Sequence, residues 1–174
     1  GLGPRRLTVP GPARGRLVLR TVEDCLALRA EISDRPRRVV VVGAGFVGCE
    51  TACTLAARGH DVTIVEPTGA PMNRVLGAAL AEAVQRHHES RGLRFVIGPG
   101  VRGYAGTDRV TGVDLDDDSV LFADLAIEAV GSVAATGWLD GNGLDLSDGV
   151  LTDNTLAVVG AGRAVAVGDV ARFP

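Results

Sequence analysis

The chain has 174 residues, 46% of them hydrophobic but only 3% aromatic, and a formal net charge of −3 at pH 7. This length suits one compact domain, and apolar content made mostly of Val, Ala and Leu favours parallel strands packed against helices. The acidic balance and the lack of a basic stripe argue against nucleic acid, and no apolar run is long enough to cross a membrane. With three cysteines, too few for a disulfide framework, and no secretory signal, we expect a cytoplasmic protein.

The chain begins without regular structure. Residues 1–16 contain prolines and arginines in no sustained period and predict an exposed, irregular lead-in. Residues 17–20 predict a short strand. Thr21 and Asp24 then form a capping-box pattern, which predicts a helix that runs to about Ser33.

A strand, a helix and a second strand follow in close succession. Residues 37–42 form an apolar, β-branched run that predicts one buried strand. Residues 46–58 have helical composition, and Gly59 marks the end of that helix. Residues 61–66 predict the second strand, and the right-handed crossover rule makes it parallel to the first. The three elements together predict one βαβ unit.

The sheet is expected to continue after this unit. A loop over residues 67–73, a helix over 76–90 and a strand over 93–97 complete another βαβ step. Residues 101–122 alternate in short segments broken by glycines and predict an antiparallel meander. Residues 124–130 then predict a parallel strand that returns to the sheet.

The C-terminal part of the chain predicts little regular structure. After the apolar run 156–159 and a glycine turn, residues 164–167 predict a last strand. The predicted fold class is therefore α/β, with a parallel sheet that carries helices on one face and an antiparallel β-meander on the other.

The strongest motif lies between the first strand of the βαβ unit and its helix. The turn reads Gly-Ala-Gly-Phe-Val-Gly and matches the pattern G-x-G-x-x-G. In this setting Gly43 permits a tight turn, Gly45 lets the backbone approach a pyrophosphate, and Gly48 lets helix and strand pack closely. The free N–H groups of the helix N-terminus, around Phe46 and Val47, favour an anion. The motif predicts a Rossmann-like dinucleotide site.

Glu66 ends the second strand, where a Rossmann-like site places an acidic residue. Its carboxylate can accept hydrogen bonds from both hydroxyls of an adenosine ribose. It should also exclude a 2′-phosphate, because two unit negative charges about 4 Å apart repel by about 4 kcal/mol at an effective dielectric constant of 20. That repulsion outweighs any attraction from Arg74, so we predict NADH rather than NADPH as the cofactor.

Nearly the whole chain resembles the NAD(P)H-binding domain of FAD-dependent pyridine nucleotide-disulfide oxidoreductases, most of all ferredoxin reductases of the putidaredoxin-reductase and dioxygenase-reductase type. The segments that carry the resemblance are residues 19–24, 42–50, 137–139 and 166–171. The resemblance implies an enzyme in which NADH donates a hydride to FAD and electrons leave singly to a ferredoxin-like iron–sulfur protein. The resemblance is also compatible with a homodimer.

The resemblance also assigns site residues by position. Glu50 corresponds to a catalytic helix glutamate near the nicotinamide, with a solvated first-turn residue as the alternative. Asp169 corresponds to an aspartate that binds the ribityl chain of FAD, and a helix N-cap there is compatible with that role. No metal ligand is expected. The predicted cofactor-binding residues are Gly43, Gly45, Phe46, Val47, Gly48, Glu66, Arg74, Gly131 and Asp169.

The chain departs from the family pattern in two places. Members carry Gly-x-x-Pro-Asn-Thr after the last parallel strand, whereas residues 131–136 lack the Pro and the Asn, which bears on nicotinamide placement. The family's first G-x-G-x-x-G, which holds the ADP half of FAD, is absent. We therefore expect a segment of a larger protein, with flavin-domain edges at 1–35 and 151–174 around an NAD(P)H-binding domain at 36–150. Alone, it should bind NADH weakly and catalyse nothing.

The other clusters of cysteine, histidine and acidic residues have structural explanations and predict no metal site. Cys49 and Cys53 are spaced like metal ligands, but a structural zinc site needs two more, so we expect small core residues. The histidines at 87–88 point in different directions, and the acidic turn 114–118 lacks the glycine and final glutamate of an EF-hand. Trp138 is expected in the core rather than at an interface.

Two alternatives to a ferredoxin reductase stay open. The same fold can serve another acceptor, namely oxygen, a disulfide or nitrite. A regulatory Rossmann module that senses NAD(H) without turnover belongs to a different class. The pair Gly168-Asp169 argues against a sensor, because a sensor has no need for a flavin-facing strand end.

Overall fold

The structure, a computed structural model, describes residues 1–174 and divides them into two compact units. The larger unit is Arg6–Gly131, and the smaller unit combines Gly1–Arg5 with Ser132–Pro174. The larger unit carries a five-stranded sheet and a three-stranded sheet, and the smaller unit carries two strand pairs. No helix of the chain is both long and apolar enough to span a membrane.

The five-stranded sheet has the order β2-β9-β3-β4-β5, and all of its pairings are parallel. Its strands are β2 (Arg16–Leu17), β3 (Arg38–Val42), β4 (Asp61–Glu66), β5 (Arg94–Ile97) and β9 (Leu125–Glu128). The chain runs outward from β3 through β4 to β5 and returns to the other side of β3 as β9. The strand order therefore reverses between β3 and β9, and open α/β sheets bind ligands at such a switch point.

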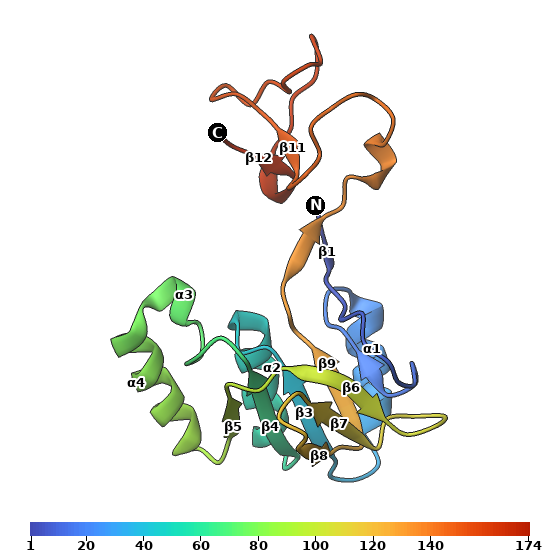
Figure 1. The fold of residues 1–174 in the computed structure, drawn as a ribbon, viewed down its shortest axis with the longest axis vertical. Helices are drawn as coiled ribbons and strands as arrows, with labels where there is room; N and C mark the ends of the chain where they lie inside the picture. Colours follow the sequence, from blue (N-terminus) through green and yellow to red (C-terminus); the bar gives the residue numbers. More distant parts are fainter. The chain divides into compact units, whose positions relative to one another are not determined.

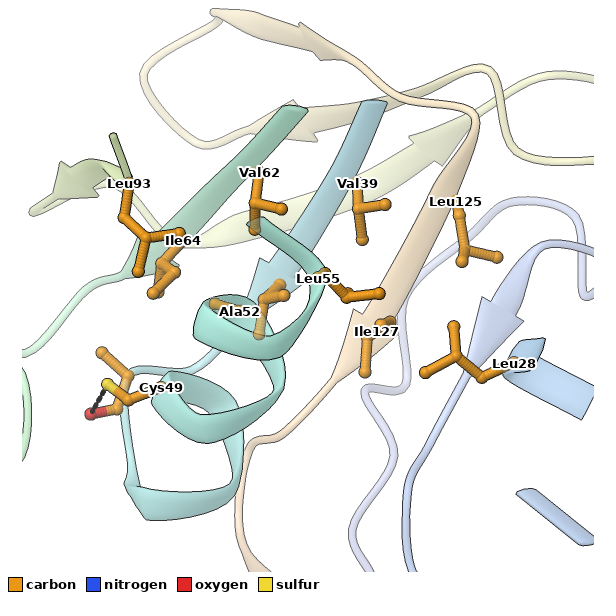
Figure 2. Packing of buried hydrophobic residues seen from close by; sticks show 12 residues of the cluster. Leu28, Val39, Cys49, Ala52, Leu55, Val62, Ile64, Leu93, Leu125 and Ile127 are labelled. Atoms are coloured by element: carbon orange, nitrogen blue, oxygen red, sulfur yellow. Dashed lines mark hydrogen bonds between the residues drawn. The ribbon is translucent and has the colours of Figure 1, made fainter. Parts of the chain in front are cut away.

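Helices cover one face of this sheet. α1 (Val22–Ile32) begins at the expected capping box, in which Thr21 and Asp24 exchange hydrogen bonds with each other's backbone N–H. α2 (Phe46–Ala57) ends before Gly59, which has a positive φ of 85°. Figure 2 shows the side chains packed between these helices and the strands: Leu28, Cys49, Ala52 and Leu55 against Val39, Val62, Ile64, Leu125 and Ile127.

An antiparallel meander covers the other face (Figure 1). It consists of β6 (Val101–Ala105), β7 (Gly112–Leu115) and β8 (Val120–Phe122). Because side chains alternate across a strand, the residues of β3, β4 and β9 that do not face the helices face the meander. The apolar residues of this set are Val40, Val42, Val65 and Ala126, and they pack with Tyr104, Val113 and Leu115. The predicted two-faced α/β architecture is confirmed.

The predicted helix over residues 76–90 is wrong at its start. The structure has a short helix α3 (Asn73–Leu76), followed by α4 (Ala78–Glu89). Gly77 separates them with a φ of 74°, a conformation that glycine adopts without steric cost and that ends one helix before the next begins.

The smaller unit has only short elements. β1 (Leu2–Pro4) pairs with β10 (Ser132–Ala134) in antiparallel fashion, and β11 (Val150–Leu151) pairs in parallel with β12 (Ala171–Arg172). The predicted strand over residues 164–167 is wrong, because only an isolated bridge joins this segment to Ala157.

The core of the smaller unit is correspondingly small. Its buried members are Val150, Val158 and Ala166. Trp138 lies in the 3₁₀ turn η1 (Gly137–Leu139) and is 77% exposed, so its predicted place in the core is wrong. A unit with so few buried side chains cannot cover a large aromatic ring.

A buried ion pair lies between the sheet and the meander of the larger unit. The Oε1 atom of Glu128 accepts hydrogen bonds from Arg16 Nη2 (2.7 Å) and from the Tyr104 hydroxyl (2.8 Å), and Oε2 has no partner. Burial and then the Glu128 carboxylate raise the pKa of Tyr104, which therefore keeps its proton as a donor. Arg16 also donates to the carbonyl groups of Leu7 and Val9. The pair thus ties the irregular lead-in to the sheet.

We predict that Glu128→Ala lowers the free energy of unfolding by about 3 kcal/mol, because it leaves the largely buried Arg16 guanidinium without its counter-ion. Urea unfolding followed by circular dichroism measures this loss. Arg102→Ala, which breaks the exposed Arg102–Asp118 pair, is the control and should leave stability almost unchanged. Equal losses in the two variants would contradict a structural role for the buried pair.

Candidate functional site

Two glycines of the turn after β3 are required by the fold itself. Gly43 has a φ of 101°, and a Cβ atom there would overlap the carbonyl oxygen of Ala129. A Cβ atom on Gly48 would overlap the carbonyl oxygen of Gly43. These two glycines let the first turn of α2 pack directly on the backbone that follows β3 and β9.

Gly45 is different, because nothing in the protein requires a glycine there. Its φ of −76° suits any residue, and a Cβ atom on it would meet no atom within 4 Å. Gly45 is the N-cap of α2, with no side-chain capping bond, and Phe46 and Val47 after it are half exposed. The turn is therefore an open cradle beside the positive end of a helix, a place that favours a negatively charged group.

The carboxylate of Glu66 reaches this turn from the end of β4. Its Oε2 accepts a hydrogen bond from the backbone N–H of Ala44 (2.8 Å). Its Oε1 accepts one from the backbone N–H of Thr68 (2.9 Å) and one from the Thr68 hydroxyl (2.6 Å). Neither Ala44 nor Thr68 was expected from the sequence, although a hydroxyl residue two positions after an acidic one is a recurrent pattern of local hydrogen bonding.

The carbonyl oxygen of Ala44 holds the turn from its other side. It accepts hydrogen bonds from the backbone N–H of Met72 (3.0 Å) and from the Cys49 thiol (3.6 Å; Figure 2). Burial raises the pKa of Cys49 to about 11, so its thiol keeps its proton and donates at neutral pH. Cys49 is a buried core residue, as expected. The end of β4 and the loop after it are thus bonded to the two polar groups of Ala44, through Glu66 and Met72.

An open pocket of about 490 Å³ runs along α2 next to the cradle. Phe46, Glu50 and Cys53 face it from one side of the helix, as residues three and four positions apart do. Glu50, the predicted catalytic residue, is exposed at this pocket. The full lining is Phe46, Cys49, Glu50, Cys53, Thr54, Met72 and His88.

Cys53 and His88 join α2 to α4 at this pocket. The Cys53 sulfur lies 3.2 Å from His88 Nδ1. Burial raises the pKa of the Cys53 thiol and lowers the pKa of the His88 imidazole, so both groups are neutral at pH 7 and the tautomer of His88 sets which of them donates. Cys53 is only partly buried, in contrast to the core position expected for it. Nothing in the sequence predicted this contact, because the two residues lie 35 positions apart.

The remaining predicted residues lie at separate places. Gly131 follows β9, has a φ of 99° and is exposed at the same sheet edge as the cradle. Arg74 is exposed on α3. Asp169 belongs to the smaller unit and lies in the 3₁₀ turn η2 (Gly168–Val170), whose N-cap is Val167. The N-cap position considered for Asp169 is therefore wrong.

Comparisons with known proteins cover the whole chain. The family model described as pyridine nucleotide-disulphide oxidoreductase matches residues 1–174. A probable ferredoxin reductase, CtmF of Castellaniella defragrans, is 34% identical over 100% of the chain and 42% of its own length. The chain thus spans less than half the length of this relative.

Two solved structures show the same fold at full coverage of the chain. The ferredoxin reductase for the CYP199A2 system of Rhodopseudomonas palustris is 34% identical and superimposes with a TM-score of 0.93 over 99% of this chain and 43% of that one. The covalent complex of putidaredoxin reductase with putidaredoxin matches with 29% identity and a TM-score of 0.90, again over 99% of this chain and 43% of that one.

The two kinds of glycine in the turn should respond differently to a methyl group. We predict that Gly48→Ala lowers the free energy of unfolding by about 2 kcal/mol or more, because the new Cβ atom overlaps backbone that cannot move aside. Gly45→Ala should stay within about 1 kcal/mol of the wild type. Thermal unfolding of both variants measures the difference, and a similar loss in the two would mean that Gly45 is also a packing glycine.

The Cys53–His88 contact should make stability depend on pH. Because the pKa of His88 is lower in the folded chain than in the unfolded chain, the unfolded chain binds a proton more readily, and stability is lost as the pH falls from about 6.5 through the folded pKa. We predict that the melting temperature of His88→Gln falls less between pH 7 and pH 5 than that of the wild type. Superimposable pH profiles of His88→Gln and the wild type would exclude His88 as a titrating group.

Proposed function

The chain belongs to the pyridine nucleotide-disulphide oxidoreductase family, and we propose that it is the NADH-binding part of an FAD-dependent reductase that passes electrons to a ferredoxin-like iron–sulfur protein. The family and the ferredoxin reductases within it are flavoprotein enzymes that use FAD and NAD(P)H. Because the chain spans less than half of these relatives, the complete reaction belongs to a larger protein.

The observation that carries the proposal is the open cradle at Gly45 with the Glu66 carboxylate beside it. The cradle offers unpaired N–H groups and the positive end of α2 to a diphosphate, and no side chain fills it. Glu66 offers a negatively charged acceptor one strand away, bonded to Ala44 of the same turn. Both lie at the carboxyl edge of the sheet, next to the switch between β3 and β9, where a dinucleotide binds across the crevice.

The residues of the chain hold and orient the dinucleotide. When bound, NADH supplies the hydride that reduces FAD. In our proposal, the turn at Gly45 anchors the diphosphate and Glu66 accepts from the adenosine ribose. Phe46 and Glu50 line the pocket on α2 and would border the nicotinamide end. Asp169 is the residue of this chain proposed to bind the ribityl chain of FAD.

The cofactor preference follows from the charge of Glu66. Its carboxylate is held by three hydrogen bonds, one from the turn and two from Thr68, so it would meet the ribose as a fixed negative charge. A 2′-phosphate at that place would be repelled. We therefore propose NADH as the physiological donor, with Arg74, exposed on α3, as a peripheral contact.

The smaller unit supports the proposal that residues 151–174 are an edge of a flavin domain. Three large apolar side chains of this segment are more than half exposed: Val165 (70%), Val167 (66%) and Phe173 (58%). Clusters of exposed apolar side chains mark surfaces that another domain or protein covers.

Binding of the reduced dinucleotides tests the proposal directly. We predict that the wild-type chain binds NADH more tightly than NADPH in calorimetric titrations. Glu66→Ala should weaken NADH binding by about tenfold or more, because a hydrogen bond to a charged group contributes about 1.5 to 3 kcal/mol. The same variant should bind NADPH no more weakly than the wild type, because the repulsion is gone.

Asp61→Ala is the matched control for Glu66→Ala. Asp61 begins the strand that Glu66 ends, so the variant removes a carboxylate from the opposite edge of the sheet. It should bind both dinucleotides like the wild type. Tighter binding of NADPH than NADH by the wild-type chain, or a wild-type chain that binds neither, would contradict the proposal.

A further inference from the structure

We propose that Thr68 is a positioning residue that fixes the Glu66 carboxylate and thereby sharpens the choice of NADH over NADPH. The inference rests on the proposed function and adds a residue to the site that neither the glycine motif nor the acidic strand end indicates. Thr68 lies in the loop after β4 and gives Glu66 two of its three hydrogen bonds.

The hydrogen bonds on Glu66 determine which oxygen is free for a ligand. A carboxylate oxygen offers about two lone-pair directions. Both directions of Oε1 are taken by the N–H (2.9 Å) and the hydroxyl (2.6 Å) of Thr68. Oε2 accepts only the N–H of Ala44 (2.8 Å) and keeps one direction free. A ribose hydroxyl would therefore bond to Oε2, the oxygen next to the glycine turn.

The Thr68 hydroxyl is the part of this arrangement that a side-chain substitution removes. At 2.6 Å its bond to Oε1 has the short length of a charge-assisted hydrogen bond. Without it, the N–H groups of Ala44 and Thr68 still hold one oxygen each, but the carboxylate can turn and offer its free directions elsewhere. A carboxylate that can turn gains less from the ribose and also moves away from a 2′-phosphate. Loss of the hydroxyl should therefore weaken NADH binding without weakening NADPH binding equally.

A purely local role for Thr68 gives a different result. The same pattern of bonds occurs in the smaller unit, where the N–H (2.8 Å) and the hydroxyl (2.7 Å) of Thr155 bond to Asp153 Oδ1 and close a loop. If Thr68 only closes its loop in this way, its loss would disturb the binding of the two dinucleotides to the same extent. Thr155 also supplies a matched control for the substitution.

The test is calorimetric titration of the chain and of Thr68→Val, Thr68→Ser and Thr155→Val with NADH and NADPH, with thermal unfolding of each variant. We expect Thr68→Val to bind NADH about fivefold more weakly and to narrow the ratio of the two affinities by about the same factor, as for one partly exposed hydrogen bond to a charge. Thr68→Ser keeps the hydroxyl and should stay within about twofold of the wild type. Thr155→Val should change neither affinity.

Each other outcome has a separate meaning. Equal weakening of NADH and NADPH binding in Thr68→Val, or an unchanged ratio, would overturn the positioning role while leaving the proposed function in place. If Thr68→Ser fails to keep the wild-type ratio of NADH to NADPH affinity, the positioning role is overturned as well, because the hydroxyl is then not the group that matters. A wild-type chain that binds no dinucleotide would instead refute the proposed function itself.

Discussion

The first turn of α2 lies with its backbone directly on the backbone at the ends of β3 and β9, and the rest of the site depends on this contact. It exists only because Gly43 and Gly48 have no side chains, since a Cβ atom on either would overlap a carbonyl oxygen. The contact aims the free N–H groups of α2 at the edge of the sheet where the strand order reverses. Gly45 differs from these two packing glycines, because no atom of the protein lies where its side chain would be and that space is open to a ligand.

Hydrogen bonds around Ala44 make this arrangement rigid. The N–H of Ala44 donates to Glu66 at the end of β4, and its carbonyl oxygen accepts from Met72 after β4 and from Cys49 in α2, so three segments meet at one residue. A site fixed in advance loses little entropy when it binds its ligand, which favours affinity and selectivity together. On the far face of the sheet, Glu128 stands beside Val42, the last residue before the turn, and anchors the lead-in through Arg16.

The parts of the structure that local sequence dictates could be predicted, and the parts that depend on distant segments could not. The βαβ unit, the capping box at Thr21 and the approach of Glu66 to the glycine turn follow from periodicity, capping chemistry and motif spacing. The helix break at Gly77 was missed because the flanking residues are good helix formers. Trp138 was misplaced because the smaller unit buries few side chains. The Cys53–His88 contact was not predicted because the two residues lie 35 positions apart in the sequence, on different helices.

Backbone amide shifts during titration with NADH test the central claim most directly, because they report where the dinucleotide lies without any substitution. We predict that the largest changes in ¹H–¹⁵N spectra occur at Gly45, Phe46 and Val47, with further changes at Ala44 and from Glu66 to Thr68. Saturable binding that leaves these amides unmoved and shifts those of another surface would contradict it, since the diphosphate would then rest somewhere other than on the turn that the fold leaves open.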